Sequence, residues 1–217
     1  MSEIISIREK IDRDVFDYQV LQGALTGYSK PRDKITRLLD SGAIVRVKKG
    51  LYCFGKVLRR EPVSREYLAN LIYGPSYVSL EYALSYHGLI PERVEVVTSV
   101  TTRRSRGFLT PFGSYYYRIL SESRYAVGVI LERSGSTQFL MASPEKALID
   151  KIWTDKRFQG ERISDYEAYL SEDLRIERDT LVSLNSSSLR SVARAYNSPK
   201  IRNLIRYLKQ LEESRNA

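Results

Sequence analysis

The sequence predicts an α+β protein: an N-terminal winged helix-turn-helix, then a larger mixed α/β domain that ends in a helical tail. Two helix-like segments precede a short β-hairpin within the first sixty residues. Strand-like runs then gather into a small sheet at about residues 94–141, without the regular alternation with helices of a doubly wound fold. We therefore expect a DNA-binding domain at residues 1–60 and an effector domain at residues 61–217.

The first two helices are predicted from their start and stop signals. The first is expected at residues 16–25. The second begins near Pro31, because the missing N–H of proline costs nothing in a first turn, and it ends at Gly42, a residue type that favours a left-handed cap. Its apolar residues recur at the spacing of a single helix face: Ile35, Leu38 and Leu39.

A basic hairpin follows the second helix. The β-branched residues 43–47 and the apolar residues 51–54 are joined by Lys48-Lys49-Gly50, which predicts two strands and a tight turn. In a winged helix-turn-helix, the second helix enters the major groove, where arginine can pair with guanine edges, while lysines of the wing suit phosphates. The predicted DNA-binding residues are Lys30, Arg32, Lys34, Thr36, Arg37, Arg46, Lys48 and Lys49.

The positive charge of the chain is concentrated rather than scattered. Of the formal net charge of +9, residues 30–60 carry ten basic and two acidic residues, a net +8. Residues 186–217 carry seven basic and two acidic residues, a net +5. A solvated basic surface is the simplest explanation of such a segment, but its coincidence with a helix-turn-helix and a wing favours double-stranded operator DNA as a partner.

Three sequence segments together resemble the AbiEi family of antitoxins, which belong to type IV toxin–antitoxin and abortive-infection (AbiE) systems. They are Lys49-Gly50-Leu51-Tyr52, the stretch from Tyr77 to Pro91, and Ser143-Pro-Glu-Lys-Ala-Leu-Ile-Asp150. The resemblance spans roughly residues 15–155, and residues 156–217 match no motif of that family. It implies that the winged helix represses the operon and that the protein counteracts a nucleotidyltransferase-like toxin.

Two further basic clusters are candidate auxiliary contacts with nucleic acid or with the toxin. The first lies in a predicted loop between strands: Arg103, Arg104 and Arg106. The second lies on an amphipathic C-terminal helix and the helix before it: Arg190, Arg194, Arg202, Arg206 and Lys209. The alternative is that neither cluster binds a partner, and that the first is only a solvated turn and the second only a solvated helix face.

No feature of the sequence supports an enzyme. His87 is the only histidine and stands at a predicted helix end before Gly88, where it interacts favourably with the helix dipole. A single histidine cannot form a metal-binding histidine cluster, so we expect neither a metal nor another cofactor. Two alternatives to the antitoxin remain. One is a winged-helix regulator with a ligand-sensing domain and no toxin partner. The other is a DNA-targeted nuclease, whose candidate carboxylates would be Glu81, Glu95 and Glu132.

The apolar stretches indicate where the protein is found. The longest, residues 125–131, is much shorter than the roughly 20 residues of a membrane-spanning helix, and the first ten residues lack the apolar core of a secretory signal. Cys53 is the only cysteine, which excludes an internal disulfide. We therefore expect a cytoplasmic protein with no membrane partner.

Overall fold

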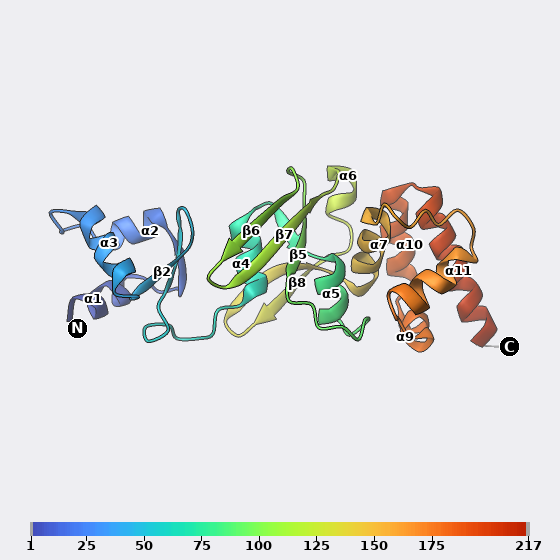
Figure 1. The fold of residues 1–217 in the computed structure, drawn as a ribbon, viewed down its shortest axis with the longest axis horizontal. Coiled ribbons are helices and arrows are strands. Elements are labelled where there is room, and N and C mark those ends of the chain that lie inside the picture. Colours follow the sequence, from blue (N-terminus) through green and yellow to red (C-terminus); the bar gives the residue numbers. More distant parts are fainter. Residues whose placement is uncertain (1, 216–217) are drawn as a thin grey trace.

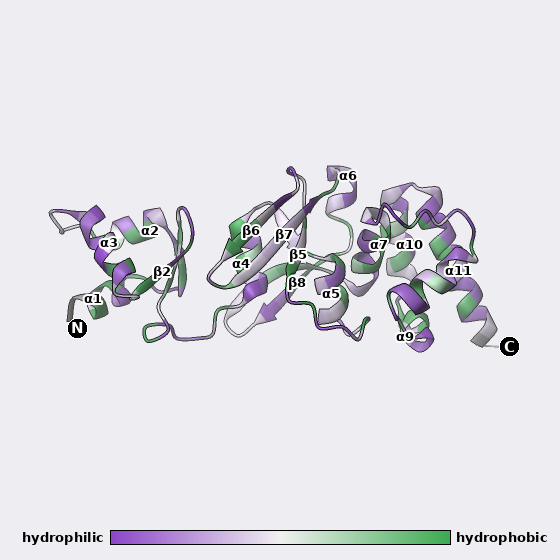
Figure 2. Cartoon of the chain, viewed as in Figure 1, coloured by the Kyte–Doolittle hydropathy of each residue, from purple (hydrophilic) through white to green (hydrophobic). Residues whose placement is uncertain are grey.

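The computed structural model describes residues 2–215 and shows an elongated molecule with three consecutive parts (Figure 1). Helices and a small sheet lie at the end that holds the N-terminus, a larger sheet lies in the middle, and helices lie at the opposite end. The architecture is α+β. Most helices carry both apolar and hydrophilic residues (Figure 2), as expected where one side of a helix covers a core.

The first part, residues 2–60, is called the N-terminal module below. Its elements are α1 (Ser2–Lys10), β1 (Val15–Asp17), α2 (Tyr18–Ala24), α3 (Pro31–Asp40), β2 (Ile44–Lys48) and β3 (Leu51–Phe54). The strands form an antiparallel sheet in the order β1-β3-β2. The helices and this sheet enclose a core of buried apolar residues: Ile7, Ile11, Phe16, Leu21, Leu25, Ile35, Leu38, Ile44, Tyr52 and Phe54.

Local capping explains where α2 and α3 begin and end. The Asp17 carboxylate accepts a hydrogen bond from the Val20 N–H at 2.9 Å and so caps α2. Pro31 is the first residue of α3, and Gly42 follows that helix with a φ of +69°. These bounds of α3 agree with the prediction from sequence.

The predicted first helix begins too early, because Phe16 belongs to β1. Phe16 pairs with Tyr52 of β3, and its ring centroid lies 4.7 Å from that of Phe54. Packing against the two aromatic residues of β3 requires an extended backbone at Phe16, and this tertiary contact outweighs the helical pattern of residues 16–25. The helix α2 therefore starts only at Tyr18.

The middle part is built on a mixed sheet, called the larger sheet below, with the strand order β6-β7-β5-β4-β9-β8. Its strands are β4 (Ser76–Val78), β5 (Val97–Thr101), β6 (Arg106–Thr110), β7 (Gly113–Ile119), β8 (Val129–Ser134) and β9 (Thr137–Ala142). The pairs β4–β9 and β5–β7 are parallel, and the other pairs are antiparallel. Strands β6 and β8 are the two edges.

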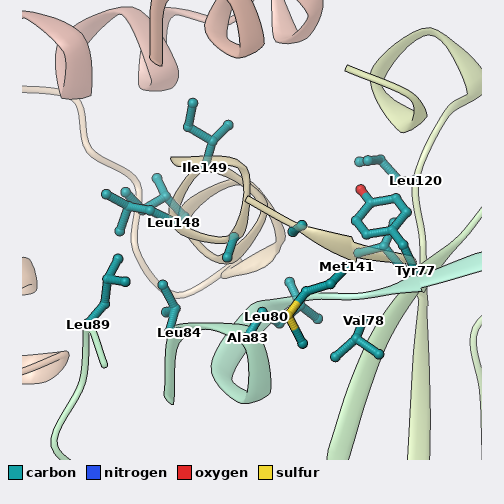
Figure 3. Close-up of a cluster of buried hydrophobic side chains, with 14 of the residues drawn as sticks. Tyr77, Val78, Leu80, Ala83, Leu84, Leu89, Leu120, Met141, Leu148 and Ile149 are labelled. Atoms are coloured by element: carbon teal, nitrogen blue, oxygen red, sulfur yellow. The ribbon is translucent and has the colours of Figure 1, made fainter. Parts of the chain in front are cut away.

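Helices cover both faces of the larger sheet. On one face lies α4 (Arg65–Ile72), whose Ala69 carbonyl accepts a hydrogen bond from the Tyr117 hydroxyl at 2.6 Å. On the other lie α5 (Leu80–Tyr86) and α7 (Pro144–Thr154). Figure 3 shows apolar side chains of α5, α7 and the sheet meeting in one cluster, which includes Leu84, Met141 and Leu148.

The last part is helical, and α10 and α11 pack against each other and against α7. Its elements are α8 (Asp165–Ala168), a π-helical turn (Tyr169–Asp173), α9 (Arg178–Ser183), α10 (Ser186–Tyr196) and α11 (Pro199–Arg215). The apolar stripe predicted for the C-terminal helix faces the core: Ile201, Leu204 and Leu208 are buried, whereas Ile205 and Leu211 are partly buried and pack against that core. Among residues 2–215, no helix has both the length and the apolar character to cross a membrane.

The larger sheet extends beyond the predicted range of residues 94–141. Strand β4 was not predicted, because it has three residues, all buried, and so shows no alternation. Strand β6 begins at Arg106, inside the predicted loop. The apolar stretch at residues 125–131, inside the predicted range, is a strand only in its second half, since the short helix α6 (Glu122–Tyr125) comes first and β8 begins only at Val129, after Gly128 with a φ of +84°.

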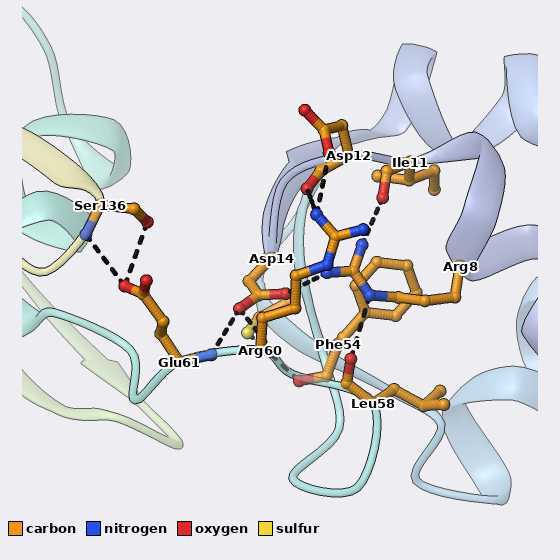
Figure 4. Close-up of polar contacts among 10 residues, drawn as sticks. Arg8, Ile11, Asp12, Asp14, Phe54, Leu58, Arg60, Glu61 and Ser136 are labelled. Atoms are coloured by element: carbon orange, nitrogen blue, oxygen red, sulfur yellow. Dashed lines mark hydrogen bonds and ion pairs between the residues drawn. The ribbon is translucent and has the colours of Figure 1, made fainter.

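The link between the N-terminal module and the larger sheet is held by polar contacts (Figure 4). The Asp14 carboxylate pairs with Arg8 at 2.8 Å and accepts hydrogen bonds from the backbone N–H groups of Arg60 and Glu61. The Glu61 carboxylate in turn accepts hydrogen bonds from the N–H and the hydroxyl of Ser136, in the β8–β9 turn. The exposed segment at Arg60 and Glu61, the predicted boundary between residues 1–60 and 61–217, thus forms hydrogen bonds with both the N-terminal module and the larger sheet.

Strand β3 is buried on both of its faces. Tyr52 and Phe54 belong to the core of the N-terminal module, whereas Leu51 and Cys53 belong to the apolar cluster of the larger part of the chain. Val15 and Val47 from the neighbouring strands join that second cluster. The small sheet therefore has helices of its own module on one face and contributes to the core of the larger part with the other.

Candidate nucleic-acid interface

Helix α3 has one buried face and one exposed basic face. Ile35 and Leu38 are buried in the module core, and Arg32, Thr36 and Arg37 are exposed. The Thr36 hydroxyl donates to the Arg32 carbonyl at 3.2 Å, a contact within the helix. Within residues 2–215 neither arginine forms an ion pair. Their guanidinium groups are therefore available to an external partner.

The other two predicted residues of this helix region lie beside its exposed face. Lys30 is exposed and precedes the first turn of α3 without a side-chain capping bond. Lys34 is half-buried, with its ammonium 5.2 Å from the centroid of the Tyr28 ring. Two exposed carboxylates, Asp33 and Asp40, lie on the same helix and reduce its positive charge.

The predicted wing residues fall into two groups: two are exposed, and one makes a contact inside the molecule. Arg46 and Lys49 are exposed, and Gly50 takes a φ of +84° that lets the chain reverse. The ammonium of Lys48 instead donates a hydrogen bond to the Ile72 carbonyl at 2.5 Å. Lys48 thus faces the larger sheet, and the expectation that it contacts phosphate must be revised, because its charge serves a contact inside the molecule.

Arg103 and Arg106, from the predicted loop cluster that also holds Arg104, lie close enough to Lys48 to act on its charge. Burial lowers the pKa of the Lys48 ammonium, and the charges of Arg103 and Arg106 lower it further. All three arginines are exposed. The structure therefore brings together two groups of basic residues that are more than fifty positions apart in the sequence.

Four of the five predicted basic residues of the C-terminal helices line one open groove between α10 and α11. The groove has a volume of about 440 Å³, and its lining includes Ala193 and Ile205 together with Arg190, Arg194, Arg202 and Arg206. None of these four arginines forms an ion pair with a described residue. Lys209 is not part of this lining, and its ammonium lies 3.4 Å from the Glu213 carboxylate.

The candidate catalytic groups do not converge. The His87 ring nitrogen Nε2 lies 2.8 Å from the Ala142 carbonyl oxygen, so it is occupied by a backbone contact. Glu81 pairs with Lys151, Glu95 pairs with Arg65 and Arg93, and Glu132 is half-buried on β8. In the described part of the chain, no three histidine, cysteine, aspartate or glutamate side chains are placed to hold a metal ion.

An open cleft between α5, α7 and the larger sheet was not predicted from the sequence. Its volume is about 500 Å³, and it is lined by aromatic and charged groups that include Tyr116, Arg118, Lys156 and Arg157. The Arg118 guanidinium lies 5.2 Å from the centroid of the Tyr116 ring. These residues come from segments far apart in the sequence, and no local motif marks them.

Comparison with known proteins shows a similar fold but no family. No family model matches the chain, and no curated protein matches it. Among solved structures, the chain is similar to the RV2827C protein from Mycobacterium tuberculosis, with a TM-score of 0.56 and 14% sequence identity. The similarity covers 98% of this chain and 81% of that one, so all three parts of the chain take part in it.

Proposed function

We propose that this chain is a DNA-binding antitoxin that represses its own operon and counteracts a nucleotidyltransferase-like toxin. The observation that carries the DNA-binding half is the exposed basic face of α3, with Arg46 and Lys49 also exposed on the hairpin that follows it. The order of the N-terminal elements, helix, strand, two helices and two strands, supports this proposal, because a winged helix is expected to have that order. An α-helix fits the major groove of DNA, where arginine recognises guanine.

The toxin-binding half rests on the resemblance to AbiEi antitoxins and on the second basic surface. The groove between α10 and α11 lies at the opposite end of the molecule from α3 (Figure 1). Its lining combines apolar residues with four arginines, which suits an acidic segment of a partner protein. A regulator that senses a small ligand is the alternative, and the cleft at Tyr116 and Arg118 is the observation that favours it.

The DNA-binding half is tested on α3. Replacing Arg32 or Arg37 with alanine should lower the affinity for a duplex from the chain's own upstream region by about 1–3 kcal/mol where the arginine contacts a base edge. Affinity is measured by fluorescence anisotropy at fixed salt, on the upstream duplex and on a scrambled duplex. Both variants remove an exposed side chain, so the fold should be preserved.

Arg13→Ala is the matched control, because Arg13 is an exposed arginine of the same module outside α3 and the β2–β3 turn. It should bind both duplexes like the unchanged protein. Equal affinity of the Arg32→Ala, Arg37→Ala and Arg13→Ala variants for the upstream duplex would show that α3 is not the helix that contacts the bases.

A further inference from the structure

The C-terminal end of α4 gathers basic groups from two different segments. A helix C-terminus leaves carbonyl groups without intrahelical partners and carries a partial negative charge. Here the Ile72 carbonyl accepts the hydrogen bond of Lys48 from the N-terminal module. Two residues later, the Gly74 carbonyl accepts a hydrogen bond of 3.4 Å from the Arg103 guanidinium in the β5–β6 loop. Lys48 and Arg103 are therefore held beside each other.

The loop that carries the arginines is fixed by the same region. The Tyr73 hydroxyl donates to the Arg104 carbonyl at 3.2 Å, and the Arg103 guanidinium lies 5.1 Å from the centroid of the Tyr73 ring. The Ser105 hydroxyl oxygen accepts a hydrogen bond from the Ile119 N–H at 3.0 Å. The Arg106 guanidinium stands 5.0 Å from the centroid of the Phe108 ring. Such a preorganised loop loses little conformational freedom when it binds a partner.

Two arginines remain available to a partner, one in this loop and one at the start of β6. Arg104 and Arg106 are exposed, and neither forms an ion pair within the described residues. The exposed Lys49 follows Lys48 directly in the β2–β3 turn, so the basic surface of the module continues onto the edge of the larger sheet. The loop is rich in hydrophilic residues, as Figure 2 shows for the turn between β5 and β6.

We propose that Arg104 and Arg106 bind the phosphate backbone of the same duplex that α3 reads. The inference rests on the proposed DNA-binding function and extends the binding surface from the N-terminal module onto the larger sheet. Guanidinium groups form bidentate, charge-assisted hydrogen bonds with phosphate. These contacts carry no sequence information, because they reach the backbone and not the base edges. A competing explanation exists for charges on β6, since charged residues protect edge strands from pairing with other chains.

The experiment measures duplex affinity against salt concentration for the Arg104→Ala/Arg106→Ala variant. Affinity should fall to the same extent for the upstream duplex and for the scrambled duplex. The slope of log K against log salt should become shallower by about 1.8, because each lost phosphate contact removes about 0.9. Thermal unfolding of the variant, followed by circular dichroism, confirms that the fold is retained.

Two controls separate this effect from total charge and from edge protection. Arg162→Ala/Arg178→Ala removes the same charge from two exposed residues of the C-terminal helical part, and Arg133→Ala removes an exposed arginine from the opposite edge strand β8. Both control variants should keep the slope of the unchanged protein. An equal loss in the Arg162→Ala/Arg178→Ala control would overturn the proposal.

The same titration distinguishes failure of this inference from failure of the proposed function. If the loop variant keeps the slope of the unchanged protein while the α3 variants bind more weakly, the loop has no phosphate contact and the α3 assignment stands. If the unchanged protein binds neither duplex, the DNA-binding function itself is overturned, and this inference with it.

Discussion

The buried pair Lys146 and Asp150 is the most unusual set of contacts at the scale of single residues. Both side chains are fully buried one turn apart on α7, and their charged atoms are 3.1 Å apart. The hydroxyls of Tyr77, Ser79 and Tyr196 all donate to the Asp150 carboxylate. Burial lowers the pKa of Lys146, against the opposing influence of Asp150. One ion pair thereby joins α7 to the sheet, to the start of α5 and to α10.

Removal of one member of this pair should destabilise the protein strongly. Lys146→Met leaves the buried Asp150 carboxylate without its counterion, and Asp150→Asn leaves the buried Lys146 ammonium without its counterion. Each single variant should lower the free energy of unfolding by about 3–5 kcal/mol. The double variant Lys146→Met/Asp150→Asn buries no charge and should lose clearly less than the sum of the two. Urea unfolding of the four proteins measures this coupling. Strict additivity would show that the two residues act independently.

At the scale of elements, what could be predicted depended on whether the signal was local. Helix α3 was predicted because its start depends on neighbours in sequence, with Pro31 at its first position. The start of α7 is equally local, since the Ser143 hydroxyl caps the helix by accepting from the Lys146 N–H at 3.2 Å. Strands β1 and β4 depend on distant partners. Val78 of β4, for example, pairs with Met141. No pattern within a few residues shows such a pairing.

The candidate site follows the same division. The exposed basic face of α3 could be predicted, because helical spacing determines which side chains share a face. The orientation of Lys48 could not, since it depends on the Ile72 carbonyl of another part of the fold. The same is true of the groove between α10 and α11: each arginine was singled out from its own helix, but only the packing of the two helices places them around one groove.

The end of α7 offers a second element whose chemistry can be tested. The Asp155 carboxylate accepts hydrogen bonds from the Arg157 N–H at 3.0 Å, the Tyr169 hydroxyl at 3.1 Å and the Lys151 ammonium at 3.3 Å. Burial alone would raise the pKa of this carboxyl group. The hydrogen bonds and the charge of Lys151 outweigh that effect and lower the pKa to about 2.

This lowered pKa predicts a pH dependence of stability. Because the folded pKa lies below the ordinary value of 3.8, Asp155 stabilises the fold above about pH 4, and the contribution is lost as the pH falls toward 2. Its size is about 2 kcal/mol. Asp155→Asn should therefore lower the free energy of unfolding at pH 7 and have much less effect near pH 2. A difference that is the same at both pH values would refute the assignment.

At the scale of the whole molecule, the two proposed functions lie at opposite ends of a tightly connected structure. The N-terminal module contributes Val15, Val47, Leu51 and Cys53 to the apolar cluster of the larger part. Deleting the module would expose the apolar partners of these residues, so a truncated fragment would report on folding as much as on function. Substitutions at the surface of the full chain avoid this problem.

Full-length variants should separate DNA binding from toxin neutralisation. The Arg32→Ala/Arg37→Ala variant should no longer bind the upstream duplex. It should still rescue growth when the toxin is co-expressed, because the proposed toxin surface lies at the opposite end of the molecule from α3. Arg194→Glu/Arg202→Glu, in the groove between α10 and α11, should bind the duplex and fail to rescue growth. If the α3 variant, shown to be folded, no longer rescues growth, then neutralisation requires the DNA-binding end.

The position of Cys53 makes its alkylation a measure of how often the N-terminal module opens. The thiol is fully buried where the small sheet adds to the larger core, and burial raises its pKa to about 11. An exposed cysteine reacts with alkylating reagents through its thiolate, which attacks the reagent and displaces its leaving group. In the closed molecule the reaction is therefore blocked by both inaccessibility and protonation. Each alkylated chain records an opening that exposed Cys53, and at reagent concentrations where alkylation is faster than reclosure the rate of mass increase gives the frequency of that opening without any engineered probe.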